Sequence, residues 1–253
     1  MYKFDKIAKV YDLYSTGVPG DMKYYLNEAQ KSKGKVLEIA AGTGRIFLEL
    51  IKNNIDAYGI DISSQMLSVL KEKAKKQKLD IKNRTSKQDM RNFKLKEKFD
   101  LIIIPYRAFL HNITIEDQLA TLNNCYKHLK PNGKLILNFF HFNPLFVVKR
   151  MKSKKVLPLG TINKKDYRLK VFEETVYNFK TQSINVTFHF EEKEKGKPIN
   201  KFKDNFIINW IGIREFEHLA ERSNFKISKL YGNFYKKPFK KESDELIWVL
   251  QKK

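Results

Sequence analysis

The stretch VLEIAAGTG, residues 36–44, decides the fold. Its apolar first half predicts a short strand that ends at a turn containing Gly42 and Gly44, and the pattern from Arg45 to Lys52 predicts a helix directly after the turn. In such a strand–turn–helix unit the backbone of the turn can come close to a ligand, and the first N–H groups of the helix point outward. The stretch therefore predicts a ligand site at the carboxyl end of a strand in an α/β fold.

The residues around this turn indicate the kind of ligand. A dinucleotide-binding turn needs a third glycine for close packing of helix on strand, and Phe47 stands at that place, which disfavours NAD and FAD. Glu38 lies four positions before Gly42, and Asp61 follows Gly42 by 19 residues, where a carboxylate can hold both hydroxyls of a ribose. Asp89 closes a third strand segment. Three carboxylates at one edge of a sheet suit a cationic cofactor better than a pyrophosphate.

Outward from the turn, strands alternate with helices through the first half of the chain. The continuous apolar run 99–105 is typical of a strand buried on both faces of a parallel sheet. Strand and helix patterns follow one another over residues 57–61, 63–78, 99–105, 115–129 and 134–140. This alternation predicts right-handed βαβ units and a mostly parallel sheet.

The second half of the chain changes character after Pro144. Segments rich in β-branched and aromatic residues occupy 165–180, 182–192 and 201–211. The middle segment alternates cleanly, with Phe188 and Phe190 on one face and Thr187 and His189 on the other. We expect a small antiparallel sheet over about residues 160–211, inserted into the α/β domain, and then a return to that domain. The return is predicted as a helix over 214–225 and two strands over 226–232 and 245–251.

The composition sets limits on function. The chain has 253 residues, 42% of them hydrophobic and 31% charged, which suits a large globular core and excludes a disordered chain. A single cysteine, Cys125, excludes an internal disulfide framework, and its place beside leucines in a predicted helix indicates a core residue. No spacing of His, Asp or Glu suggests a metal site. The chain has no transmembrane run and no secretory signal pattern, so we expect a cytoplasmic protein with no membrane association.

The formal net charge of +22 raises the question of nucleic acid. Only eight of the 50 basic residues are arginines, and the lysines are scattered along the chain. Recognition of phosphates and bases relies on forked arginine contacts, so this pattern favours a solvated surface over a dedicated polyanion patch. The net charge alone therefore identifies no partner, and the scattered, arginine-poor pattern disfavours a nucleic acid without excluding it.

Five segments in chain order resemble the motifs of class I S-adenosylmethionine-dependent methyltransferases. LEIAAGTGR (37–45) is similar to the glycine-rich first motif, with Ala40 and Ala41 where Gly and Cys are commoner. The other four segments are similar to the ribose-binding motif, the adenine-binding motif, the fourth motif, and the turn and strand after it. They are YGIDISSQML (58–67), KQDMRNF (87–93), FDLIIIPYRAFLHN (99–112) and LKPNGKLIL (129–137). Each motif is weak alone, but five in order over residues 2–142 are specific.

The resemblance implies that the cofactor is S-adenosyl-L-methionine. Asp61 would hold its ribose, and Asp89 and Met90 would contact the amine and the ring of its adenine. Tyr11, in a short leading helix, would close over the methionine end. The full set of cofactor residues implied by the resemblance is Tyr11, Glu38, Ala40, Gly42, Thr43, Gly44, Asp61, Ile62, Met66, Asp89, Met90 and Pro105.

The second half resembles a narrower group. An inserted antiparallel sheet, a helix and LYGNFYKKPF (230–239) before the last strand are similar to small-molecule methyltransferases, including glycine or sarcosine and amino-sugar N-methyltransferases. The implied fold is a Rossmann-like, doubly wound, mostly parallel seven-stranded sheet with a small antiparallel β insertion after the fifth strand. Residues 1–145 and 212–253 would form the cofactor-binding domain, and residues 146–211 a lid or substrate subdomain.

The sequence identifies no catalytic residue, because methyl transfer needs a general base only if the nucleophile arrives protonated. The residues we expect near the substrate are Tyr14, Tyr106, Arg107, His111 and His189. Arg107 could equally form a surface ion pair, and His111 could cap or pack against a helix. The polar face of the insertion, with Thr187 and His189, is expected to look toward Tyr106 and Arg107.

The leading hypothesis is therefore a methyltransferase that modifies a nitrogen or oxygen atom of a small-molecule acceptor. One alternative is an RNA or protein methyltransferase on the same scaffold, which the net charge of +22 favours but which the segment IPYR (104–107), unlike an NPPY-type base-methylation motif, does not. The other alternative is a non-catalytic binder of the cofactor, since this chemistry has no obligatory side chain. The sequence leaves the acceptor and the oligomeric state open.

Overall fold

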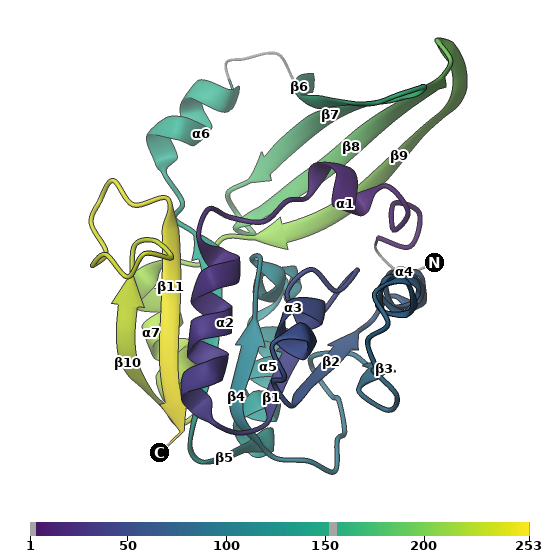
Figure 1. Cartoon of the computed structure of the whole chain (residues 1–253). Coiled ribbons are helices and arrows are strands. Elements are labelled where there is room, and N and C mark those ends of the chain that lie inside the picture. The colour runs from purple at the N-terminus through teal and green to yellow at the C-terminus, as the bar shows by residue number, and fades with distance from the viewer. Residues whose placement is uncertain (1–3, 152–155, 253) are drawn as a thin grey trace.

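A computed structural model describes residues 4–151 and 156–252, which form two β-sheets with helices packed around the larger one (Figure 1). The larger sheet has the strand order β10-β11-β5-β4-β1-β2-β3. Strands β1 to β5 are parallel, and β11 is antiparallel to β5 and β10. The bounds are β1 Val36–Ile39, β2 Ala57–Asp61, β3 Thr85–Lys87, β4 Phe99–Ile104, β5 Leu129–Phe140, β10 Phe225–Tyr231 and β11 Glu245–Lys252. This is the mostly parallel, seven-stranded, Rossmann-like sheet that the sequence predicts.

Helices cover both faces of this sheet (Figure 1). The helices of the chain are α1 Tyr11–Tyr14, α2 Asp21–Ser32, α3 Phe47–Lys52, α4 Ser64–Lys76, the 3₁₀ helix η1 Ala108–His111, α5 Ile115–His128, α6 Pro144–Met151 and α7 Ile213–Arg222. Helices α2, α3 and α4 pack on one face, and α5 and α7 pack on the other. Within the described ranges, no helix is long and apolar enough to cross a bilayer.

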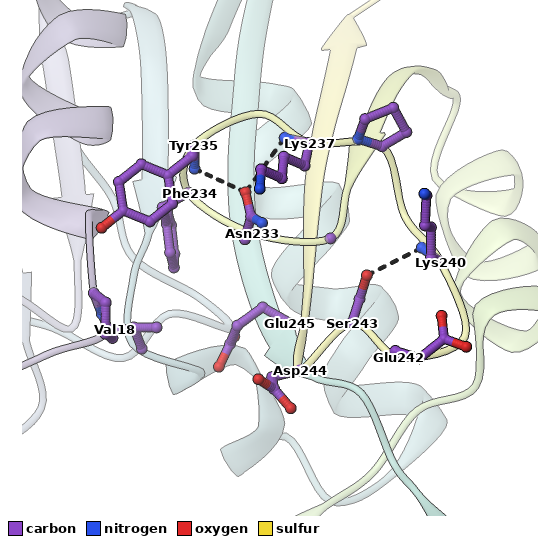
Figure 2. A pocket seen from close by; sticks show the side chains of 13 residues that line it. Val18, Asn233, Phe234, Tyr235, Lys237, Lys240, Glu242, Ser243, Asp244 and Glu245 are labelled. Atoms are coloured by element: carbon purple, nitrogen blue, oxygen red, sulfur yellow. Dashed lines mark hydrogen bonds between the residues drawn. The ribbon is translucent and has the colours of Figure 1, made fainter.

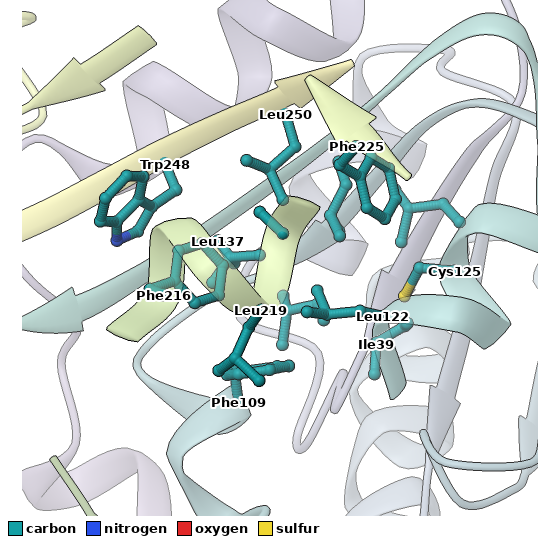
Figure 3. Close-up of a cluster of buried hydrophobic side chains, with 14 of the residues drawn as sticks. Ile39, Phe109, Leu122, Cys125, Leu137, Phe216, Leu219, Phe225, Trp248 and Leu250 are labelled. Atoms are coloured by element: carbon teal, nitrogen blue, oxygen red, sulfur yellow. The ribbon is translucent and has the colours of Figure 1, made fainter. Parts of the chain in front are cut away.

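Alternate residues of the central strands serve the two faces. In β4, Leu101 and Ile103 belong to the cluster under α2 to α4, while Ile102 and Ile104 belong to the cluster under α5 and α7. The continuous apolar run is therefore required by burial on both sides. Figure 3 shows the second cluster, in which Cys125 is fully buried and lies among leucine and aromatic side chains. The prediction that this cysteine is a core residue is confirmed.

The inserted sheet follows β5 and has four antiparallel strands in the order β6-β7-β8-β9. They are β6 Val156–Lys164, β7 Tyr167–Asn178, β8 Ser183–Glu194 and β9 Lys197–Asn209. The sequence predicts the last three. Strand β6 was not predicted, because its pairing is irregular between Pro158 and Gly160 and because it is an exposed edge strand without an apolar alternation. Helix α6 is a further element that the sequence pattern did not predict.

The position of the inserted sheet follows from its connection to the carboxyl end of β5. The chain leaves the large sheet at Phe140, the carboxyl end of β5, and returns after Asn209 into α7. The insertion therefore lies above the carboxyl ends of the parallel strands, with α1 between the two sheets (Figure 1). In open α/β sheets this edge is where ligands bind.

A buried polar network joins α2 and β11 to the end of β4 through Asn138 of β5. The Asn138 Oδ1 atom accepts from the hydroxyl of Tyr25 at 3.2 Å, and Nδ2 donates to Glu245 at 2.8 Å. Glu245 also accepts from Nε of Arg107 at 3.0 Å. Asn138 is fully buried. Each buried polar group has its hydrogen-bond partner inside the network, so removal of one side chain leaves another without a partner and should lower stability.

Replacement of Asn138 by alanine tests this network. Asn138→Ala leaves the buried Tyr25 hydroxyl and one oxygen of Glu245 without this partner, so we expect the free energy of unfolding to fall by about 2–3 kcal/mol. Urea unfolding followed by circular dichroism measures the change. Asn27→Ala, at an exposed position of α2, is the control and should change stability by about 0.5 kcal/mol or less. Equal stability of the two variants would show that the network is not a structural anchor.

Candidate functional site

The turn between β1 and α3 has the backbone that the sequence predicts, but its two glycines do different things. Gly42 and Gly44 both have positive φ, at 55° and 85°. A Cβ atom on Gly42 would come no closer than 3.9 Å to its neighbours, so open space lies beside the backbone there. A Cβ atom on Gly44 would lie 2.7 Å from Cγ of Leu70 and 3.0 Å from Cγ of Leu48. Gly42 therefore leaves room for a ligand, whereas Gly44 allows α3 and α4 to pack closely.

Asp61 lies at the end of β2 and connects this turn to the next. Its Oδ2 atom accepts from the backbone N–H of Gly42 at 2.8 Å, and its Oδ1 atom accepts from that of Ser63 at 2.8 Å. Asp61 is buried, and burial raises the pKa of its carboxyl. Ile62 follows it half-buried, and Met66 is buried in the first turn of α4, where the hydroxyl of the N-cap residue Ser63 accepts from its N–H.

Glu38 is a second buried carboxylate at this edge. Within the described part of the chain its Oε2 atom has no hydrogen-bond partner, and burial raises the pKa of its carboxyl well above the usual range. The charge of Arg45 opposes this rise, but Arg45 is itself bound through both terminal nitrogens to Asp21, at 2.9 and 2.6 Å. Glu38 can therefore accept a hydrogen bond from a ligand and would be stabilised by a positive one.

Asp89 and Met90 lie after β3, at the same edge of the sheet. Asp89 accepts from Nε of Arg91 at 2.9 Å, and this pairing lowers the pKa of its carboxyl. Asn112 donates to Sδ of Met90 at 3.2 Å. The pairing between Asp89 and Arg91 was not predicted from the sequence, although the two residues are only two positions apart.

Two acidic side chains, Asp12 and Asp5, bind the N-terminal segment to the turns after β1 and β2, and neither was predicted as a site residue. Asp12 of α1 accepts from the hydroxyl of Thr43 and binds Lys73 of α4 at 2.8 Å. Asp5 accepts from the hydroxyl of Ser63 at 2.5 Å. These contacts place Tyr11 close to the site, and burial raises the pKa of its hydroxyl to about 12.

The residues after β4 have a strained backbone. Pro105 is buried, and Tyr106 and Arg107 follow with φ values of 54° and 65°. Two consecutive left-handed residues that are not glycine are costly, and such strain is concentrated at functional sites. The side chain of Arg107 pairs with Glu245, which agrees with the ion-pair interpretation of this residue. The ring of Tyr106 lies beneath the guanidinium of Arg45 at 5.6 Å.

The two histidines proposed as substrate contacts have different surroundings. The ring centroid of His111 is 5.3 Å from that of Phe4 and 5.5 Å from that of Phe206, so His111 packs between the N-terminal segment and the inserted sheet. His189 lies on the outer face of that sheet beside Glu174, with 3.4 Å between Nε2 and Oε2. The expected orientation of the insertion is therefore wrong, because its apolar face, with Phe188 and Phe190, covers Tyr14 of α1.

A cavity of about 530 Å³ adjoins the site beside the loop before β11 (Figure 2). Residues 232–245 form most of its wall, and Val18 and Pro19 close it from the other side. Glu245 lines this cavity and also pairs with Arg107, so the cavity borders the segment after β4. Among the described residues, no cluster of three or more His, Cys, Asp or Glu side chains is placed to hold a metal ion.

Comparison with known proteins agrees with this arrangement. A family model described as a methyltransferase domain matches residues 36–133. A protein named as a putative methyltransferase, YqeM, from Bacillus subtilis (strain 168), is 22% identical over 98% of this chain and 97% of its own length. The dTDP-3-amino-3,4,6-trideoxy-alpha-D-glucopyranose N,N-dimethyltransferase of Streptomyces venezuelae is also 22% identical, over 92% of this chain and 94% of its own length. The crystal structure of an S-adenosylmethionine-dependent methyltransferase from Clostridium acetobutylicum superposes with a TM-score of 0.80 at 17% identity and 98% coverage of both chains.

The two glycines of the turn provide a matched pair of variants. Gly44→Ala should lower the free energy of unfolding by at least about 2 kcal/mol, because the new methyl group meets Leu70 and Leu48 in a left-handed backbone. Gly42→Ala carries the backbone strain alone, about 1 kcal/mol, but places its methyl group in the open space beside the turn. We therefore expect Gly42→Ala to weaken binding of S-adenosylmethionine more than its effect on stability explains. Thermal unfolding and titration calorimetry measure the two effects, and an equal loss of stability in both variants would contradict the assignment.

Proposed function

The chain is a class I S-adenosylmethionine-dependent methyltransferase, and on that premise we propose that it transfers the methyl group to a nitrogen or oxygen atom of a small molecule. The observation that carries the proposal is the inserted sheet, whose apolar face closes over the N-terminal segment and the carboxyl edge of the large sheet. A covered site suits a small acceptor, whereas a macromolecular acceptor needs an open approach. The similarity to an amino-sugar N,N-dimethyltransferase over nearly the whole chain supports the same conclusion.

The residues at the carboxyl edge fit the proposed cofactor. Asp61 is already aligned by two backbone N–H groups and keeps free lone pairs for the ribose hydroxyls. The open space beside Gly42 allows close approach to the backbone, and the unpaired Oε2 atom of Glu38 favours a cationic ligand. Asp89 and Met90 would contact the adenine. The remaining proposed contacts are Tyr11, Ala40, Thr43, Gly44, Ile62, Met66 and Pro105.

The chemistry that the chain must support is an in-line displacement. The cofactor supplies a methyl group bound to a positively charged sulfur. Loss of that charge in the transition state is favoured by a site that excludes water and holds the acceptor in line, rather than by any obligatory side chain. Tyr11 and Tyr14 of α1 lie between the turn and the inserted sheet, where they can exclude water. We assign residues 146–211 to the lid that selects the acceptor and the two flanking parts to cofactor binding.

Asp61 provides a test of cofactor binding. Asp61→Ala removes charge-assisted hydrogen bonds to the ribose, so the affinity for S-adenosylmethionine should fall by about 1.5–3 kcal/mol, more than tenfold in Kd. Asp61→Asn, which keeps one acceptor for the N–H groups of Gly42 and Ser63, separates loss of the ligand contact from loss of the turn. Asp80→Ala, at an exposed position beyond α4, is the control. Calorimetry that finds unchanged affinity in both Asp61 variants would remove the assigned role of this residue.

The class of acceptor is tested with methyl-labelled cofactor. The protein is incubated separately with metabolite, RNA and protein fractions, and the label that each fraction incorporates is counted. We expect incorporation into the metabolite fraction. Incorporation into RNA alone would favour the alternative that the net charge of +22 suggests, and binding of the cofactor without incorporation anywhere would favour a non-catalytic binder.

A further inference from the structure

Asp204 of β9 is a carboxylate on the apolar face of the inserted sheet, where Glu173 of β7 also lies because it pairs with Phe188. The side chains of β9 alternate, so Phe202, Asp204 and Phe206 share one face of the strand. Asp204 pairs directly with Phe188 of β8, and Phe188 belongs to the face that covers α1. The half-buried Asp204 therefore points toward the N-terminal segment and lies in a row of aromatic residues.

Aromatic rings surround this carboxylate. The ring centroid of Phe188 lies 5.5 Å from that of Phe206 and 5.6 Å from that of Tyr14. The ring of Phe4 lies 5.1 Å from that of Phe206. Tyr14 is 5.7 Å from Tyr11, the residue beside the turn of the proposed cofactor site. The cluster therefore adjoins Tyr11, which belongs to the proposed cofactor site.

Two polar atoms in this cluster lack protein partners. Oδ2 of Asp204 and the hydroxyl of Tyr14 are buried, and neither has a hydrogen-bond partner among the residues that the structure describes. The backbone N–H groups of Asn205 and Phe4 bind the carboxylate of Asp204, and Lys6 lies near it. A buried acceptor that is left unpaired costs about 1–3 kcal/mol, and more when it is charged. A donor from outside the chain would remove that cost.

We propose that Asp204, together with the rings of Tyr14, Phe188 and Phe206, forms the subsite that binds the amino group of the acceptor as an ammonium ion. The proposal rests on the proposed function and narrows it from a nitrogen or oxygen acceptor to an amine. Aromatic faces attract a cation through their quadrupoles, and a carboxylate pairs with it directly. A neutral alcohol carries no charge to pair with the carboxylate or to interact with the ring quadrupoles, so it would gain little from either contact.

The same carboxylate can prepare the amine for reaction. An ammonium nitrogen has no lone pair, so one N–H bond must break, and Oδ2 of Asp204 accepts that proton. The freed lone pair then forms the new C–N bond while the bond between sulfur and the methyl carbon breaks and its electron pair stays on sulfur. The products are a methylated ammonium ion, a neutral thioether and a protonated Asp204. Burial raises the pKa of Asp204, which makes it a better proton acceptor than an exposed aspartate.

The first experiment tests the subsite without any methyl transfer. Methylammonium chloride is titrated into the protein in the presence of the demethylated cofactor and followed by ligand-observed NMR, with methanol and sodium chloride as matched references. We expect methylammonium to bind and methanol not to bind. Asp204→Asn should weaken methylammonium binding by at least about tenfold. Glu174→Gln, a carboxylate variant in the neighbouring row on the outer face of the same sheet, should leave it unchanged.

The second experiment tests turnover with the metabolite fraction. Acetylation of its amines before the assay should abolish incorporation of the labelled methyl group, and Asp204→Asn should lower incorporation at least about tenfold near neutral pH. Incorporation by this variant should recover as the pH approaches the pKa of a free alkyl amine, about 10, because the amine then arrives without its proton. Both variants retain the other titratable groups around the subsite, which are Asp5, Lys6, Tyr14, His111 and Glu173. Glu174→Gln also retains Asp204, so it should show the wild-type pH profile.

The outcomes separate this proposal from the proposed function. No binding of methylammonium by the wild-type protein, or equal binding by Asp204→Asn, overturns the subsite whatever the transfer assays show. Incorporation that survives acetylation of the amines overturns the amine while leaving a small-molecule methyltransferase intact. Binding of methylammonium through Asp204, with no incorporation into metabolites, supports the subsite and contradicts the proposed function.

Discussion

The candidate site depends on one carboxylate that binds the backbone of two turns. Asp61 accepts from Gly42 in the turn after β1 and from Ser63 in the turn after β2, both at 2.8 Å. The relative position of these turns is therefore set by hydrogen bonds within the protein, and such preorganisation lowers the cost of binding. The N-terminal segment is fastened to the same two turns, since Asp12 binds Thr43 and Asp5 binds Ser63.

The inserted sheet depends in turn on that segment. A four-stranded sheet of this size cannot bury its apolar face alone. Phe190 and Val171 of the insertion form one cluster with Ile7 and Val10 of the N-terminal segment and with Met66 of α4. The segment is thus the layer that joins the insertion to the cofactor side of the molecule. The insertion and α4 are thus in contact through one continuous cluster of apolar side chains.

The sequence predicted the elements that have a strong period and missed contacts that depend on geometry. The apolar run 99–105 predicts a buried strand and the alternation of 182–192 predicts a strand with one apolar face. Both strands are confirmed, as β4 and β8. The same alternation does not show which face of the insertion lies inward. The prediction that the polar face with His189 looks toward the site is wrong. Packing decides that question, because the aromatic face needs cover and α1 provides it. The glycine turn was recognised, but the packing role of Gly44 depends on Leu70, which is distant in the sequence.

The net charge of the chain and the charge of its site have opposite signs. The chain carries a formal charge of +22, yet the buried ionic side chains among the described residues are four carboxylates, of Asp21, Glu38, Asp61 and Glu245, and include no lysine or arginine. Two of them, Asp21 and Glu245, pair with the partly exposed Arg45 and Arg107, and burial raises the pKa of Glu38, Asp61 and Glu245. The candidate site therefore has more buried acidic than basic side chains among the described residues. A cationic cofactor and a cationic acceptor group each reduce the desolvation cost that these carboxylates impose on the folded chain, so ligand binding and stability should rise together.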